Sequence, residues 1–144
     1  MKTQFDSDVP TVPFISIIYR EHAKYLNEKV KDEDLSFGLY PLLIKIYYNE
    51  GIIQEELAQE FHLNESTITR NLKKLEDKEF IERIPEKRTK RIEITDKGKK
   101  TAHKVMDYDN IWDEKIKEII GQKEYDHFKN TLRKISEELI WTKQ

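Results

Sequence analysis

The residues best suited to a chemical role lie between Ser66 and Lys74, where hydroxyl side chains are mixed with long cations. The apolar residues between Ser66 and Leu75 are Ile68, Leu72 and Leu75. Their i, i+4, i+7 spacing places them within an arc of about 60° on one side of a helix. Ser66, Arg70 and Lys73 therefore point away from that stripe. A helix face of short hydroxyls and long cations can reach base edges and phosphates in a major groove of DNA.

Charge is distributed unevenly along the chain, whose 144 residues carry a net charge of -2. Residues 64–100 hold 12 Lys and Arg against 8 Asp and Glu, a net of +4, and the remainder holds 14 against 20, a net of -6. Four of the six arginines fall in this segment: Arg70, Arg83, Arg88 and Arg91. A charge run alone is usually a solvated face. Arginine, however, is the cation suited to bidentate phosphate and base contacts, so the bias favours a nucleic-acid partner.

Two short helices joined by a very short turn are expected to position the polar face. The first spans Gln54–Phe61, the turn is His62-Leu63, and the second spans Asn64 to about Lys78, with asparagine as a favourable N-cap. The small Ala58 allows the helices to cross closely, and Ile68, ten residues later, fills the crossing. This spacing predicts a helix-turn-helix motif.

A charged hairpin is expected immediately after the second helix. Residues 80–84 and 90–94 partly alternate between apolar and polar and are predicted as strands, with 85–89 as their loop. Five cations and one anion lie from Arg83 to Arg91. Cations can simply protect an exposed sheet edge, which explains the charge but not the preference for arginine. A helix-turn-helix followed by a basic hairpin is a winged helix, whose tip can place an arginine in a minor groove.

Two further helices are expected before this motif. The first runs over about residues 13–31, with Pro13 in its first turn. The second is capped by Ser36, starts with Phe37, carries Pro41 in its first turn and stops at residues 49–51. Together with the helices after the hairpin, they predict a mainly α fold with a small β-wing.

Two helices are also expected after the hairpin. Thr95 caps one that reaches about Ile120 and is closed by Gly121, and the last helix continues to the C-terminus. The first and last helices carry more apolar surface than a small winged-helix core can cover, so we expect them to form a homodimer interface. The expected interface residues are Phe14, Ile17, Ile18, Phe128, Leu132, Ile135 and Leu139.

The composition argues against several other classes of protein. Cysteine is absent, which excludes disulfides, thiolate catalysis and thiolate zinc sites. Neither a His/Glu metal spacing nor a convincing acid/base pair is found, so no metal, cofactor or enzymatic activity is expected. No run approaches the roughly 18 apolar residues of a membrane span, and residues 1–10 lack the pattern of a secretion signal. A cytoplasmic protein without a membrane partner is expected.

Several short motifs occur together between Gln54 and Gly98. They are Leu57-Ala58, Ser66-Thr67-Ile68-Thr69-Arg70, Leu75 with Ile81-Glu82-Arg83, Glu86-Lys87-Arg88, and Ile94-Thr95-Asp96-Lys97-Gly98. This combination, with its flanking helices, resembles the MarR family of winged helix-turn-helix transcription regulators. The resemblance implies a single domain over residues 1–144, with dimerisation helices at about 13–31 and 96–144. The winged helix-turn-helix DNA-binding lobe then lies at about 36–95.

The resemblance also implies roles for individual residues. Arg88 corresponds to the wing arginine of the family's Asp-x-Arg element and inherits the minor-groove role, with Glu86 in place of the aspartate. Glu79 stands where the family often has glycine before the wing, and His62 stands in place of the usual turn glycine. The expected DNA-contacting residues are Gln54, Ser66, Thr67, Thr69, Arg70, Lys73, Lys74, Arg83, Lys87, Arg88, Lys90 and Arg91.

The expected function is that of a dimeric, sequence-specific regulator that binds a pseudo-palindromic site in double-stranded DNA. The resemblance further implies a repressor that a small aromatic or phenolic ligand releases from DNA. The candidate ligand-binding residues are Tyr19, Arg20, His22, Tyr40 and Tyr47. Two alternatives stay open: a winged-helix module that binds another protein, and an architectural DNA binder without sequence preference.

Overall fold

The structure is a computed structural model that describes residues 2–36, 38–61 and 63–141. The chain forms two compact units, one up to Met106 and one from Asp107 onward. The elements are α1 (Thr11–Val30), η1 (Lys31–Glu33), α2 (Tyr40–Tyr48), α3 (Gln54–Glu60), α4 (Glu65–Asp77), β1 (Ile81–Glu86), β2 (Thr89–Ile94), α5 (Asp96–Ile120) and α6 (Gln122–Trp141). The predicted mainly α fold with a β-wing is confirmed. Phe37 and His62, predicted in the second helix and the turn, lie outside the described residues.

The helix predicted to start with Phe37, behind a Ser36 cap, begins instead at Tyr40, as α2. The carbonyl of Ser36 accepts the backbone N–H groups of Leu39 at 3.0 Å and Tyr40 at 3.2 Å, so a turn precedes the helix. Pro41 has no N–H to donate to an earlier helical turn, and it is therefore confined to the first turn. The prediction of a Ser36 cap was wrong because the proline sets the start of this helix.

The helix-turn-helix forms as predicted from α3 and α4. The Asn64 side chain accepts the backbone N–H of Thr67 at 2.8 Å, which caps α4. Glu65 lies in the first turn, where its negative charge is favourable to the helix dipole. The residues predicted to face inward are buried, except that Phe61 is only half-buried. The buried ones are Leu57, Ala58, Ile68, Leu72 and Leu75.

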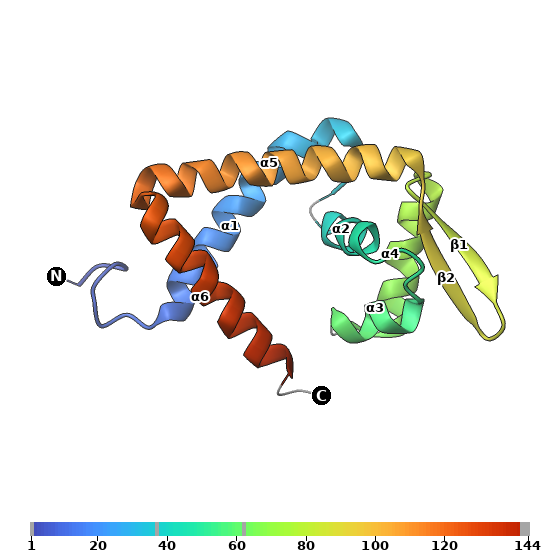
Figure 1. Ribbon diagram of the computed structural model, residues 1–144, viewed down its shortest axis with the longest axis horizontal. Coiled ribbons are helices and arrows are strands. Elements are labelled where there is room, and N and C mark those ends of the chain that lie inside the picture. The colour runs from blue at the N-terminus through green and yellow to red at the C-terminus, as the bar shows by residue number, and fades with distance from the viewer. Residues whose placement is uncertain (1, 37, 62, 142–144) are drawn as a thin grey trace. The chain divides into compact units, whose positions relative to one another are not determined.

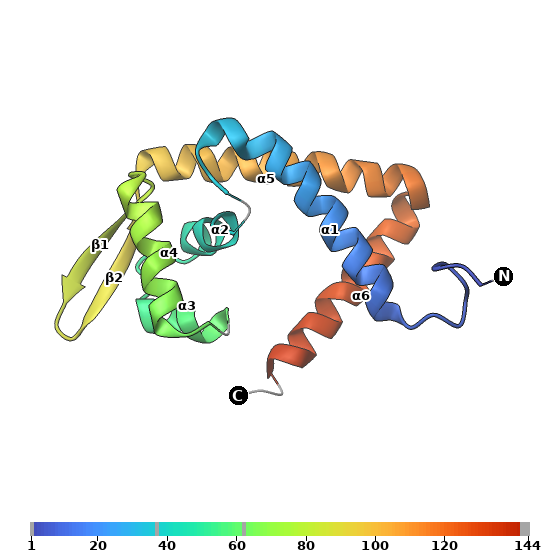
Figure 2. The same cartoon turned by 180° about the vertical axis from the view of Figure 1, so that it is seen from behind.

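The wing is longer than predicted, and its turn is shorter. Antiparallel pairing continues to Pro85 opposite Lys90 and to Glu86 opposite Thr89, which leaves only Lys87 and Arg88 in the turn. The predicted five-residue loop was wrong because Pro85 lies in β1, which pairs only with β2 among the described residues and is therefore an edge strand, where proline is tolerated. In both views the ribbon runs beside α4, and its tip lies at the end of α4 that α3 adjoins (Figures 1 and 2).

A tight junction joins α4, the wing and α5. Glu79, which follows α4, has a φ of 64°, the left-handed conformation that glycine adopts most easily. Its carbonyl accepts the Thr95 hydroxyl at 2.7 Å, and the same hydroxyl oxygen accepts the Gly98 backbone N–H at 3.0 Å. The predicted Thr95 cap is thereby confirmed, and the first turn of α5 is fixed to the end of α4.

The second unit contains the end of α5 and all of α6. Gly121 has a φ of 85° and ends α5 as predicted. Tyr125 is buried, its ring lies 4.9 Å from Lys117 Nζ, and burial with a hydrogen bond to Asp113 raises the pKa of Tyr125 to about 12. Among the described residues, no helix of either unit is both long and apolar enough to cross a bilayer.

The junction predicts a strong effect of one added methyl group. A Cβ at Gly98 lies 2.2 Å from the Phe80 carbonyl oxygen and 2.7 Å from Ile94 Cγ1. Backbone atoms cannot swing aside, so Gly98→Ala should lower the free energy of unfolding by about 1–3 kcal/mol in urea denaturation. Gly38→Ala is the matched control, because nothing lies within 4 Å of its added Cβ. An unchanged stability of Gly98→Ala contradicts the close approach.

Candidate nucleic-acid interface

The outer face of α4 is polar and cationic. The side chains of Ser66, Arg70, Lys73 and Lys74 are exposed. Lys73 approaches Asp77 at 3.4 Å, but both side chains are well exposed, and such an ion pair exchanges easily with another partner. The Ser66 hydroxyl donates to the Asn64 side chain at 2.7 Å and so contributes to the cap. This face offers long cations that are available to an anionic partner.

A hydrogen bond fixes the start of α3 to the middle of α4. The Gln54 amide donates to the Thr69 hydroxyl at 2.7 Å. Thr67, half-buried in the first turn of α4, is approached by Arg70 at 3.4 Å. Gln54, Thr67 and Thr69, all predicted DNA contacts, therefore lie on or beside one surface with Arg70.

The wing tip carries three exposed cations within four residues. Lys87, Arg88 and Lys90 are exposed, and Lys87 has a φ of 55°. Within the part of the chain that the structure describes, none of the three forms an ion pair. A cation that forms no ion pair within the protein keeps most of its attraction for phosphate.

A hollow of about 390 Å³ connects the wing to the helix-turn-helix. Gln54 and Glu55 line it from α3, Thr69 lines it from α4, and the wing tip lines it with residues 87–90. The Thr89 hydroxyl donates to Glu55 Oε2 at 2.7 Å across it. That hydrogen bond, followed by the residue's own backbone N–H, lowers the pKa of Glu55. Thr69 of α4, the start of α3 and the wing tip therefore line one hollow.

Arg83 differs from the other predicted contacts because it pairs with an acid inside the fold. Its guanidinium donates to Glu76 Oε1 at 2.9 Å, and its backbone N–H donates to Glu76 Oε2 at 3.3 Å. The Arg83 side chain is only 11% exposed. The guanidinium lowers the pKa of the Glu76 carboxyl. Arg83 also lines the hollow, but its contacts with Glu76 place its guanidinium at the junction between α4 and β1.

Arg91 is also held by carboxylates. It forms ion pairs with Glu86, at 3.5 Å, and with Glu93. Its aliphatic chain would lie 3.4 Å from a Cβ added at Gly51, so its stem packs on the loop before α3. Arg91 therefore ties the wing to that loop, and its charge is largely compensated within the protein.

The sequence analysis predicted the same DNA-contacting role for all these cations. It missed the carboxylates that pair with some of them and not with others. Glu76 and Glu55 were not singled out, although each holds a residue of the wing. The position of Glu76 could have indicated its pairing with Arg83. It lies in the last turns of α4, seven residues before Arg83, which is near the start of the wing. No comparable spacing marks Glu55, because its partner lies 34 residues away.

The five candidate ligand-binding residues occupy different environments. Tyr19 and Arg20 are exposed on α1. His22 is half-buried, and its ring centroid lies 6.4 Å from that of Tyr40. Tyr47 shares a 2.7 Å hydrogen bond with the ring of His103 on α5. The aromatic contacts thus connect α1 with α2, and α2 with α5.

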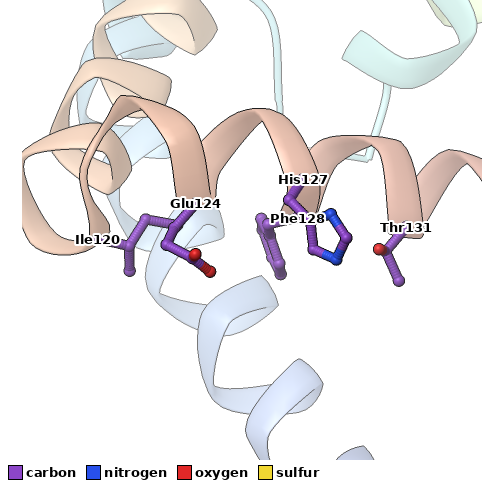
Figure 3. A pocket seen from close by; sticks show the side chains of 5 residues that line it. All are labelled: Ile120, Glu124, His127, Phe128 and Thr131. Atoms are coloured by element: carbon purple, nitrogen blue, oxygen red, sulfur yellow. The ribbon is translucent and has the colours of Figure 1, made fainter.

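The predicted dimerisation residues of α6 lie on an exposed apolar face. Phe128, Leu132, Ile135 and Leu139 are between 39% and 61% exposed. On α1, Ile18 is exposed, whereas Phe14 and Ile17 are half-buried. Near the start of α6 a hollow of about 650 Å³ is lined by Ile120, Glu124, His127, Phe128 and Thr131 (Figure 3).

The fold and this surface together define a winged helix-turn-helix protein. Residues 35–92 match the model of the MarR family. The HTH-type transcriptional regulator BilQ of Clostridium symbiosum (strain WAL-14163) is 30% identical over 129 residues, which cover 87% of this chain and 90% of BilQ. The uncharacterized HTH-type transcriptional regulator YybA of Bacillus subtilis (strain 168) is 42% identical over 89 residues, 60% of this chain and 59% of YybA.

A crystal structure of MarR has a TM-score of 0.90 against this chain at 27% identity, with 98% of each chain covered. The chain therefore belongs to the MarR family, as the sequence motifs indicated. It is a transcription regulator and not an enzyme.

The Glu76–Arg83 pair predicts a stability effect that depends on pH. Glu76→Gln weakens a charged hydrogen bond to a nearly buried guanidinium and should lower the free energy of unfolding at pH 7 by about 1–3 kcal/mol. Because the folded-state pKa of Glu76 lies below its usual 4.5, the contribution is complete above that pH and is lost as the pH falls below it. Urea denaturation at several pH values should show a smaller difference between variant and parent in acid. Asp77→Asn, an exposed neighbour, is the control; a difference that stays constant with pH contradicts the pairing.

Proposed function

We propose that this protein is a dimeric, sequence-specific DNA-binding regulator of transcription. The observation that carries the proposal is the hollow that Thr69 of α4 lines together with Lys87 and Arg88 of the wing. Exposed Arg70 and Lys74 extend the same charge along α4. A partner with closely spaced phosphates fits this arrangement.

In this proposal α4 enters the major groove. Its exposed hydroxyls and cations suit base edges and phosphates, and its apolar side is fully occupied by the core. The wing then reaches the adjacent minor groove, where Arg88 at the tip finds the most negative potential. A MarR family regulator from Listeria monocytogenes, solved in complex with 26mer DNA, shares the fold with a TM-score of 0.77 at 24% identity over 88% of this chain and 87% of that chain.

The exposed apolar face of α6 supports the dimer. A single chain leaves Leu132, Ile135 and Leu139 between 44% and 61% exposed, and apolar side chains repeated along one helix face mark an interaction surface. A second copy supplies an equal face and places a second α4 for the other half of a pseudo-palindromic site. The hollow lined by Phe128 and His127 (Figure 3) belongs to this face.

The family resemblance extends the proposal to a repressor that a small aromatic or phenolic ligand releases. Tyr19, Arg20, His22, Tyr40 and Tyr47 remain the residues proposed for that ligand. The ring contacts that connect α1, α2 and α5 supply aromatic walls, and Arg20 supplies an exposed cation for a carboxylate. Action on DNA agrees with the cytoplasmic location expected from the sequence.

Substitution of the exposed arginines tests the DNA interface. Binding to a pool of random 30-bp duplexes at several salt concentrations should weaken strongly for Arg88→Ala, with a salt slope smaller by about one, because one phosphate-like contact is lost. Arg70→Ala should also change which duplexes are retained. Arg20→Ala, on α1, is the matched control and should bind like the parent.

Three outcomes distinguish the alternatives. Unchanged binding by both Arg88→Ala and Arg70→Ala contradicts the proposed interface. Salt-sensitive binding without any retained sequence indicates an architectural DNA binder. If the parent protein fails to bind any duplex at low salt, the winged helix is a module for binding another protein.

A further inference from the structure

The acid Glu55 lies where a DNA-binding surface should avoid negative charge. Its exposed carboxylate, on the first turn of α3, lines the same hollow as Lys87 and Arg88. A carboxylate beside phosphate costs binding energy through repulsion of like charges. Unless it performs another task, its removal should improve DNA binding.

The geometry gives Glu55 such a task. Its Oε2 accepts the hydroxyl of Thr89 at 2.7 Å, and Thr89 is the first residue of β2, directly after the two-residue turn. A hydrogen bond to an ionised acceptor is stronger than one between neutral groups. The bond therefore joins the rigid helix-turn-helix to the wing at the residue next to Arg88.

The wing tip needs such a support. A two-stranded ribbon is only marginally stable by itself, and this one ends in a turn where Lys87 has a φ of 55°. Three cations, Lys87, Arg88 and Lys90, repel one another within four residues. The Arg83–Glu76 ion pair holds β1 to α4. Ile92 of β2 donates its backbone N–H to the Ile52 carbonyl at 3.0 Å and accepts the Gly51 N–H at 3.2 Å. Thr89 provides the attachment at the tip.

We propose that Glu55 is a positioning residue for the wing: through Thr89 it holds Arg88 at the distance from α4 that two adjacent grooves of DNA require. The inference deepens the proposed function and rests on it for the DNA-binding part. It assigns to Glu55 no contact with DNA. Its effect on affinity arises because a wing fixed before binding loses less conformational freedom on binding.

The proposal and simple charge repulsion predict opposite changes in DNA affinity for the substitution Glu55→Ala. Glu55→Ala removes both the charge and the acceptor, and we expect affinity for the random duplexes to fall by about threefold to tenfold. Glu55→Gln keeps an acceptor oxygen and should bind at least as well as the parent. Glu56→Ala is the matched control, an exposed acid on the same helix whose removal should slightly improve binding. Tighter binding by Glu55→Ala overturns the proposal.

Substitution of Thr89, the partner of Glu55, provides a second and independent test. Thr89→Val removes only the hydroxyl and should weaken binding like Glu55→Ala, whereas Thr89→Ser should preserve it. The loss caused by Thr89→Val should shrink when Arg88 is already alanine, because positioning acts through that side chain. An equal loss in both backgrounds shows that Thr89 contacts DNA directly and contradicts the proposal.

Amide hydrogen exchange of the free protein separates this inference from the proposed function. In Glu55→Ala and Thr89→Val, exchange at residues 87–90 should rise by about threefold to tenfold while that of α4 stays as in the parent. Glu56→Ala should leave exchange at the tip unchanged. Glu55→Gln, whose neutral oxygen accepts a weaker hydrogen bond, should raise exchange at the tip by less than Glu55→Ala. Unaltered exchange at the tip in Glu55→Ala overturns the proposal even if the parent binds DNA. If the parent binds no DNA but tip exchange is faster in Glu55→Ala and Thr89→Val than in the parent, the attachment of the wing by Glu55 is supported and only the proposed DNA-binding function is contradicted.

Discussion

The ion pair between Glu76 and Arg83 is the interaction on which the DNA-facing surface depends, because it joins α4 to the wing. One carboxylate holds both the side chain and the backbone N–H of Arg83. Leu75 at the end of α4 and Phe80 at the start of the wing are both fully buried, and the Phe80 backbone N–H donates to the Leu75 carbonyl at 3.0 Å. A buried core fixes the separation of two elements, whereas a two-point ionic contact also fixes their rotation. This pair sets the base of the wing, and the hydrogen bond between Thr89 and Glu55 then supports the tip.

The arginines of residues 64–100 fall into two groups in the structure, one paired within the fold and one facing outward. Arg83 and Arg91 are paired with carboxylates and contribute to the fold. Arg70 and Arg88 face outward without an acidic partner among the described residues. An acidic protein can present a basic surface in this way, because its acids neutralise the structural cations and leave the outward ones uncompensated. Affinity for DNA then depends on this local surface and not on the net charge of -2.

Most of the fold could be predicted from the sequence because its signals are local. The spacing of Ile68 and Leu72 defined the buried side of α4, and Asn64 and Thr95 marked helix starts that the structure confirms. The start of α2 was mispredicted because a proline outweighed a favourable serine cap. The wing turn was mispredicted because Pro85 is tolerated in an edge strand.

The site was less predictable than the fold, because its contacts join residues distant in sequence. An arginine in a basic run looks the same whether it faces solvent or a carboxylate, so Arg83 was grouped with Arg88. The 34-residue separation between Glu55 and Thr89 leaves no periodicity to detect. Only the folded chain shows which acid each cation meets.

The most direct test of the account is selection of bound duplexes from a random pool, with the mass of the protein–DNA complex measured in solution. The account predicts an enriched pseudo-palindrome whose half-sites lie about one helical turn apart. It also predicts a protein mass in the complex of twice the 17.4 kDa of one chain. Enrichment of a single half-site by a monomer, or no binding at low salt, contradicts it.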